Sequence, residues 1–160
     1  MKFGLNFTFT SVPPFNAYVG GIDFNGDGTN DDLLPGTTMG QFNCGPAKSD
    51  LLNLVSQFNQ TYAGTTSHGR VVPRLTLPSK YAFGDNLQSL DLRVSRSFVY
   101  RERLRFSIIG EVFNIYNKAN LTGYSGDLTN AAFGQPTSRA TQVFRIGWPR
   151  AFQVAMRVAF

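Results

Sequence analysis

The chain has 160 residues, the length of one ordinary domain, and a net charge of +5. Aromatic residues make up 14% of it, which excludes a fully disordered chain, and no run approaches the ~18 apolar residues that a membrane-spanning helix needs. The 16 Gly and 8 Pro residues favour strands joined by long loops, so we expect an all-β protein.

The first predicted strand covers residues 2–10. A period of two is typical of a strand with one apolar face, and polar or small residues fill the positions between the apolar ones. The apolar positions are Phe3, Leu5, Phe7 and Phe9. A long loop is expected over residues 11–87.

Residues 23–32 of this loop have the spacing of a calcium site. Oxygen ligands at alternate positions, with Gly28 at position 6 and the carbonyl of Thr29 at position 7, match a calcium-binding loop. Position 12 is Leu34 rather than the usual Glu, so Asp32 would have to substitute with a different geometry. The alternative is an Asx- and Gly-rich turn without an ion. The candidate ligands are Asp23, Asn25, Asp27, Thr29, Asp31 and Asp32.

A helix is predicted near residues 49–62 of the same loop. Its apolar residues fall on one face, which is typical of a helix packed on one side. The helix could fold over the mouth of a barrel, but we favour local packing that holds a long loop in place. The residues of this face are Leu51, Leu54, Val55, Phe58 and Tyr62.

Three further strands are predicted at residues 88–99, 103–114 and 151–160. The first two are separated by a short turn, and a second long loop covers residues 115–150. Each run has about ten residues, the length with which a tilted strand crosses a bilayer. Charged residues on the polar faces favour cross-strand pairing over substrate contact. These residues are Asp91, Arg93, Arg105, Glu111 and Arg157.

The four strands are expected to form an antiparallel meander in chain order. Alternating short turns and long loops are typical of outer-membrane barrels, in which the turns are periplasmic and the loops extracellular. Four strands cannot close a barrel, because the smallest bacterial barrels use eight. We therefore expect part of a larger barrel, with a soluble calcium-dependent β-domain for cell-surface binding or adhesion as the alternative.

Several segments resemble TonB-dependent outer-membrane receptors. Residues 111–120 resemble the penultimate strand of these receptors, with its Glu and its Asn-rich exit, and residues 149–160 resemble their last strand with its terminal aromatic residue. Residues 23–36 are similar to a loop of the Oar-like branch, whose members carry a carboxypeptidase-regulatory-like domain. The run Phe133-Gly134-Gln135 also fits this family.

The resemblance implies a 22-stranded barrel with an N-terminal plug and a TonB-like energy transducer as partner. The chain would then supply the C-terminal barrel strands, without the plug or the segment that binds the transducer. The last strand would carry the signal that the barrel assembly machinery recognises. The residues of this signal are Phe152, Val154, Met156, Val158 and Phe160.

Other functional classes lack support in the sequence. Cys44 is the only cysteine and His68 the only histidine, so no internal disulfide and no Cys/His metal cluster can form. No acidic partner for Ser67 and His68 is visible in the sequence, and the basic residues are dispersed. We therefore expect no enzymatic activity and no nucleic-acid binding, calcium as the only candidate cofactor, and a location in the outer membrane.

Overall fold

The computed structural model describes residues 1–43, 48–101, 103–141 and 147–160. Cys44 and part of the predicted loop at 115–150 lie outside the described residues. The chain divides into two compact units: unit 1 comprises residues 1–11, 86–121 and 138–160, and unit 2 comprises residues 12–85 and 122–137. No helix in the described part combines the length and the apolar character needed to cross a bilayer.

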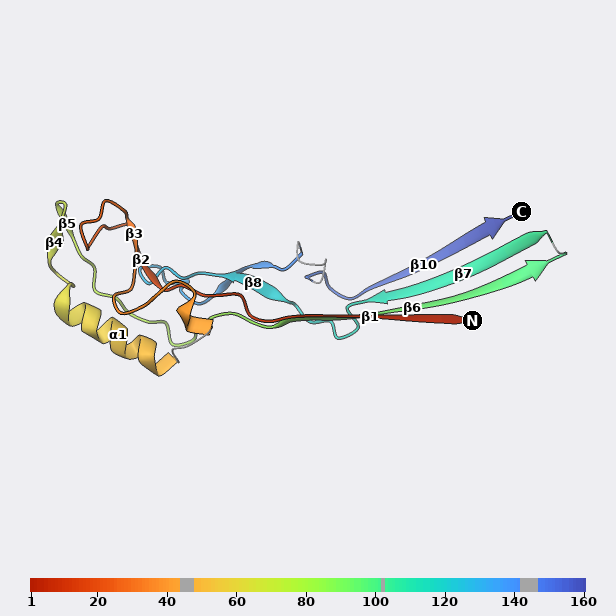
Figure 1. The fold of residues 1–160 in the computed structure, drawn as a ribbon, viewed down its shortest axis with the longest axis horizontal. Helices are drawn as coiled ribbons and strands as arrows, with labels where there is room; N and C mark the ends of the chain where they lie inside the picture. The colour runs from red at the N-terminus through yellow and green to blue at the C-terminus, as the bar shows by residue number, and fades with distance from the viewer. Residues whose placement is uncertain (44–47, 102, 142–146) are drawn as a thin grey trace. The chain divides into compact units, whose positions relative to one another are not determined.

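The strands of unit 1 agree with the sequence prediction within a few residues at each end. They are β1 (Lys2–Thr10), β6 (Leu87–Tyr100), β7 (Leu104–Phe113) and β10 (Ala151–Ala159). They form one antiparallel sheet in the order β1-β6-β7-β10, so the predicted meander is confirmed (Figure 1). Both chain termini lie at the end of the sheet where β6 turns into β7.

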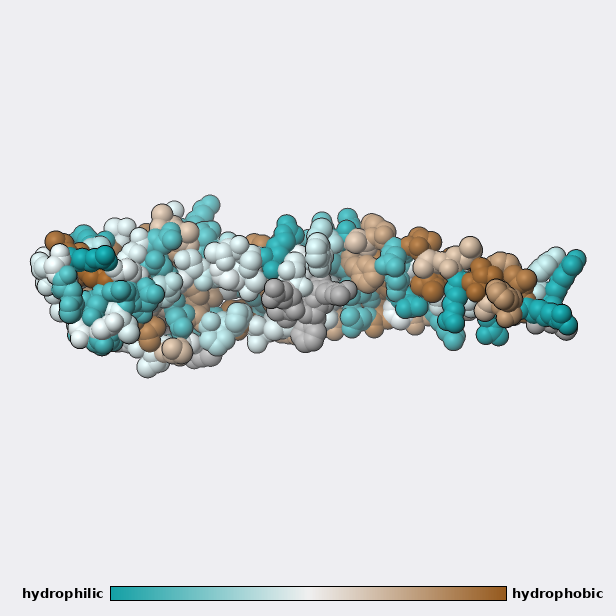
Figure 2. Space-filling view, turned by 90° about the horizontal axis from the view of Figure 1, so that it is seen from above, coloured by the Kyte–Doolittle hydropathy of each residue, from teal (hydrophilic) through white to brown (hydrophobic). Residues whose placement is uncertain are grey.

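The register of this sheet separates its two faces. Phe3 pairs with Val94, Val94 with Gly110 and Gly110 with Val154, so one row across the four strands is apolar or small. Because side chains alternate along each strand, the neighbouring rows fall on the polar face. The apolar face stays exposed: Phe3 is 69% accessible and Val154 80%. Apolar residues gather over these strands in Figure 2.

Unit 2 is built from the two long connections and contains the remaining short elements. They are β2 (Tyr18–Gly20), β3 (Asp31–Leu33), the 3₁₀ helix η1 (Gln41–Asn43), α1 (Lys48–Thr61), β4 (Thr66–Ser67) and β5 (Arg70–Val71). A further pair of strands consists of β8 (Leu121–Tyr124) and β9 (Pro136–Arg139). Two boundaries between the units fall within these strands. Helix α1 confirms the predicted helix.

Unit 2 has a hydrophobic core, which the sequence did not predict for segments interpreted as loops. The apolar face of α1 supplies Leu51, Val55 and Phe58, all buried, while Leu54 and Tyr62 are partly buried against the same cluster. The helix therefore has the packing role that we favoured. Its buried neighbours come from distant segments and are Phe15, Ala17, Val19, Ile22, Leu34, Phe42, Val72, Leu75, Leu128 and Phe133.

Phe133, the first residue of the Phe133-Gly134-Gln135 run, belongs to this core. The Phe133 side chain is fully buried, with its ring centroid 5.8 Å from that of Phe15 and 5.6 Å from that of Tyr81. Gly134 has φ +66°, and a Cβ there would lie 2.4 Å from Tyr81 Cβ, so a side chain does not fit. Its backbone N–H donates to Ser125. The motif therefore joins segments distant in the sequence.

Candidate functional site

Two of the charged residues predicted on the polar face of the sheet form a charge pair. Arg93 and Glu111 are direct neighbours across β6 and β7, and Arg93 Nη1 lies 3.3 Å from Glu111 Oε1. On the next rows towards the turn, the Ser97 and Ser107 hydroxyls are 2.7 Å apart. Cross-strand pairing of this kind is what the sequence predicted for Arg93 and Glu111.

The other charged residues of this face have different surroundings. Arg105 and Arg157 line one hollow on the polar face together with Ser97, Ser107 and Ala159. Within the described residues neither arginine has a carboxylate at ion-pair distance. The half of the polar face nearest the β6–β7 turn is therefore basic.

Asp91 acts at the opposite end of the strands rather than in a charge pair. Its Oδ1 accepts hydrogen bonds from the Ser89 hydroxyl, at 3.0 Å, and from the backbone N–H of Asn114, at 2.8 Å. Asp91 thus fixes the point where β7 ends, because Asn114 is the first residue after that strand.

Three asparagines at a spacing of three follow β7, and we call Asn114, Asn117 and Asn120 the asparagine triplet. All three have positive φ, at 49°, 51° and 45°. Asn tolerates this left-handed conformation better than most residues, because its short side chain can hydrogen-bond locally. The Asn-rich exit noted in the sequence is therefore an irregular segment with three left-handed residues, a conformation that asparagine tolerates.

The side chains of the triplet bind the ends of neighbouring strands. Asn114, which is buried, donates from Nδ2 to the carbonyls of Lys118 and Trp148, at 2.9 and 2.8 Å. Asn117 Oδ1 accepts from the N–H of Arg150 at 3.0 Å, immediately before β10. Asn120 exchanges two hydrogen bonds of 2.8 Å with the backbone of Gln88 in β6. The triplet thus connects β6, β7 and the start of β10.

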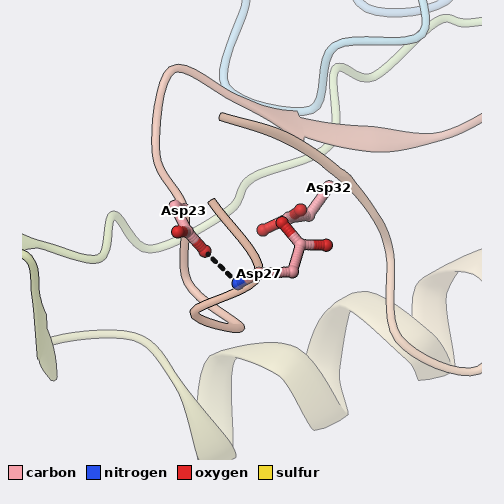
Figure 3. Close-up of side chains that lie close together, drawn as sticks. All are labelled: Asp23, Asp27 and Asp32. Atoms are coloured by element: carbon pink, nitrogen blue, oxygen red, sulfur yellow. Dashed lines mark hydrogen bonds between the residues drawn. The ribbon is translucent and has the colours of Figure 1, made fainter. Parts of the chain in front are cut away.

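The acidic loop brings part of the predicted calcium set together. One carboxylate oxygen from each of Asp23, Asp27 and Asp32 lies within 4.8 Å of the other two. Figure 3 shows the three side chains close together in the loop. The Thr29 hydroxyl donates to both Asp27 and Asp32, and the Asn25 amide donates to Asp27 at 3.1 Å. Oxygen atoms from five of the six candidate residues therefore lie in one small region.

The sixth candidate, Asp31, lies outside this cluster. Asp31 and Asp32 are consecutive in β3, so their side chains point to opposite faces. Asp32 is buried beside the cluster, whereas Asp31 is exposed and accepts from the N–H of Gly21 at 3.3 Å. Asp32, and not Asp31, therefore lies next to Asp23 and Asp27.

Much of the cluster's bonding capacity is used within the loop. Asp23 accepts the backbone N–H groups of Gly26, Asp27 and Gly28 at 2.6, 3.2 and 2.9 Å. These bonds are typical of a tight Asx-type turn, which forms with or without an ion. Calcium binding therefore stays a prediction.

The hairpin of β4 and β5 packs against this loop, a contact that the sequence did not reveal. The Ser67 hydroxyl donates to the carbonyl of Asp23 at 2.5 Å, and His68 Nε2 lies 3.4 Å from Asp23 Oδ2. Arg70 donates to the carbonyl of Gly21 at 2.8 Å. The acid partner of His68 is thus a loop residue more than 40 positions away, and spacing alone gives no signal for such a contact.

Hydrogen bonding shifts the ionisation of one carboxyl in the cluster. The Thr29 side chain and backbone N–H, and then the Asn25 amide, hold the pKa of Asp27 below its usual value of 3.8. A lowered pKa means that the ionised carboxylate stabilises the folded loop. That contribution is present above pH 3.8 and is lost as the pH falls.

The residues of the predicted assembly signal alternate along β10. Phe152 pairs with Val112, Met156 with Ile108 and Val158 with Phe106, so all lie on the apolar face. Phe160 follows the last strand residue and its side chain is fully exposed. The five residues therefore form one continuous, exposed apolar row along β10.

A family model described as an outer membrane beta barrel domain matches residues 2–153. Neither the curated proteins nor the solved structures contain a significant match to the chain.

Proposed function

Since this chain belongs to the outer membrane beta barrel domain family, which places it in the bacterial outer membrane, we propose that it forms the last strands and extracellular loops of a TonB-dependent receptor. The observation that carries the proposal is the sheet of unit 1, which has one exposed apolar face and one polar face that contains the Arg93–Glu111 ion pair. Lipid-facing barrel strands need this arrangement. The resemblance of residues 111–120 and 149–160 to the last two strands of such receptors supports this class of barrel.

The two outer strands of the sheet imply that other strands complete the barrel. Within the described residues, β1 and β10 each have a hydrogen-bonded neighbour on one side only. In lipid, an open edge leaves backbone groups unsatisfied, at several kcal/mol each. The remainder of the barrel therefore closes against both edges in this proposal, and a plug fills the lumen that the polar face lines.

The orientation in the membrane follows from the connections. Outer-membrane barrels have short periplasmic turns and longer extracellular loops. The turn between Tyr100 and Leu104 is accordingly periplasmic, and the segments of unit 2 are extracellular. The proposed role is structural and transport-related rather than enzymatic.

The competing proposal is a soluble calcium-dependent β-domain for cell-surface binding or adhesion. Such a domain has to cover its apolar face with a second layer. The acidic cluster of Asp23, Asp27 and Asp32 is the observation in its favour. Phe3, Leu5 and Phe7, each more than half exposed, weigh against it.

The receptor class is tested on the full-length protein that contains these strands. We expect the full-length protein in detergent to retain the purified periplasmic domain of a TonB-like transducer, and the 160-residue segment alone not to retain it. A full-length protein that does not bind the transducer would still be an outer-membrane barrel, but not a TonB-dependent receptor.

Deletion of Phe160 tests the proposed contact with the barrel assembly machinery. A terminal aromatic residue at the lower rim contributes on the order of 1–3 kcal/mol to stability by burial. If the assembly machinery recognises Phe160, deletion of this residue should lower the amount of assembled barrel by more than the loss of stability explains. The measurement is membrane fractionation with heat-modifiable gel mobility. Ala159→Ser, on the polar face, is the control, and equal assembly of wild type and deletion would reduce Phe160 to a rim residue.

A further inference from the structure

One arginine lies on the apolar face of the sheet. Arg96 pairs with Ile108, and Ile108 pairs with Met156, so its row is otherwise apolar and exposed. An arginine that faces lipid costs about 2–4 kcal/mol at the midplane of a bilayer and close to nothing at the interface. Its position is therefore favourable only if the guanidinium reaches polar groups at the membrane surface.

The side chain of Arg96 extends in the direction that such contact requires. Its guanidinium carbon lies 4.9 Å from the ring centroid of Phe98, which is two residues closer to the β6–β7 turn. In the turn itself, the guanidinium of Arg101 lies 5.3 Å from the ring of Tyr100. Two arginines are thus each held over an aromatic ring at the turn end of the apolar face, where hydrophilic residues gather in Figure 2.

No protein carboxylate among the described residues neutralises these two arginines. The close contacts between basic and acidic side chains found there join Arg93 to Glu111 and His68 to Asp23. A guanidinium presents a planar set of donors that matches two oxygens of a phosphate, and the rings beside it suit the boundary between headgroups and acyl chains. The turn end therefore combines an apolar row, rim aromatics and exposed cations on one face.

We propose that this part of the apolar face binds the phosphate of an anionic glycerophospholipid, with Arg96 and Arg101 as the contacts. The acyl chains then cover the row of Ile108 and Met156, while the headgroup lies at the level of the turn. The inference rests on the membrane placement and orientation given under the proposed function, and not on coupling to a TonB-like transducer. A failure to bind the transducer therefore leaves it unaffected.

Lipid retention by the full-length barrel protein tests the proposal. Native mass spectrometry compares bound phosphatidylglycerol with phosphatidylcholine of the same acyl chains. We expect the wild type to retain more phosphatidylglycerol, and Arg96→Gln to reduce that preference about fivefold, the effect of one arginine near an anionic surface. Arg101→Gln removes the cation in the turn itself, beside Tyr100, and is expected to act in the same direction.

Arg157→Gln is the matched control. Arg157 lies at a neighbouring row of the same sheet but on the polar face, so the same loss of charge should leave lipid preference unchanged. Equal retention of the two lipids by the wild type, or an equal loss in Arg157→Gln, would overturn the proposal. Stronger retention of lipid A than of phosphatidylglycerol would also overturn it, because the turn would then lie in the outer leaflet.

Discussion

Unit 1 and unit 2 place their apolar residues in opposite ways. In unit 2, Phe15, Phe58 and Phe133 are buried in a common core, while in unit 1 Phe3, Phe7 and most of β10 are exposed. A segment surrounded by water must bury its apolar surface, whereas a segment in lipid gains nothing by doing so. The apolar residues of unit 2 are therefore distributed as in a domain surrounded by water, and those of unit 1 as in strands surrounded by lipid.

The polar groups of the two units follow the same distinction. Most of the 10 acidic residues of the chain fall within unit 2, and most of the 15 basic residues fall within unit 1. Among the described residues of unit 1, the Arg93–Glu111 ion pair and the Ser97–Ser107 hydroxyl contact lie on the same face of the sheet. In unit 2, polar side chains such as those of Asp23 and Asn59 bind backbone groups of the long connections.

The largest effect is expected from a change in the core of unit 2. Phe133→Ala removes a fully buried ring and should lower the free energy of unfolding of this unit by about 3–5 kcal/mol. Phe7→Ala is the matched change in unit 1 and should have a smaller effect, because its ring is exposed and leaves no cavity. Limited proteolysis of both variants over a urea series measures the difference. Equal losses would contradict the distinction between the units.

A charged substitution on the exposed apolar face tests whether this face contacts lipid or water. Val154→Arg should destabilise the assembled barrel by about 2–4 kcal/mol if that face meets lipid. Leu52→Arg changes a residue of α1 that is 54% exposed, and should alter stability by less than about 0.5 kcal/mol. Denaturant unfolding in lipid vesicles provides the measurement. A neutral Val154→Arg would mean that this face is solvated by water.

The asparagine triplet is expected to give an intermediate effect. Asn114→Ala removes two buried hydrogen-bond donors and leaves an alanine in a left-handed conformation, so it should cost about 2–4 kcal/mol. Asn114→Gly also loses the donors but accepts the positive φ, and should cost about 1 kcal/mol less. Unfolding midpoints of the two variants check the difference. Identical midpoints would show that the backbone conformation has no share in the effect.

The smallest effect is expected at the acidic loop. If the cluster binds calcium, Asp27→Ala should weaken the affinity and loosen the loop while the strands of unit 1 stay intact. Asp31→Ala should affect binding much less, because Asp31 lies outside the cluster. Isothermal calorimetry with the full-length protein provides the measurement. Absence of calcium-dependent heat at millimolar ion would identify the loop as a turn without an ion.

The strands were predictable because their pattern is local. Alternation within ten residues fixes which side of a strand is apolar, and the short connection before Leu104 fixes the pairing of β6 with β7. The face of α1 was predictable for the same reason. In the acidic loop, spacing identified the candidate oxygens but could not show which of Asp31 and Asp32 would turn inward, because β3 pairing decides it.

The core of unit 2 was not predictable from such patterns. Phe133 contacts Phe15 and Tyr81, and the three residues come from three separate stretches of the sequence. Likewise, His68 meets Asp23 only after the β4–β5 hairpin has packed on the loop. Contacts of this kind depend on tertiary packing, so a sequence with no periodicity in those stretches was interpreted as loop.

The asparagine triplet also has a consequence for how the last strand is aligned. A slip of one residue between β7 and β10 would turn Phe152 and Val154 inward and expose Arg157 to lipid, because strand side chains alternate with a period of two. Alternating strands alone discriminate weakly against a slip of two residues, which keeps every side chain on its face. The bonds from Asn114 to Trp148 and from Asn117 to Arg150 fix the chain immediately before β10 begins. Asn114 and Asn117 therefore set the register of the whole last strand against β7.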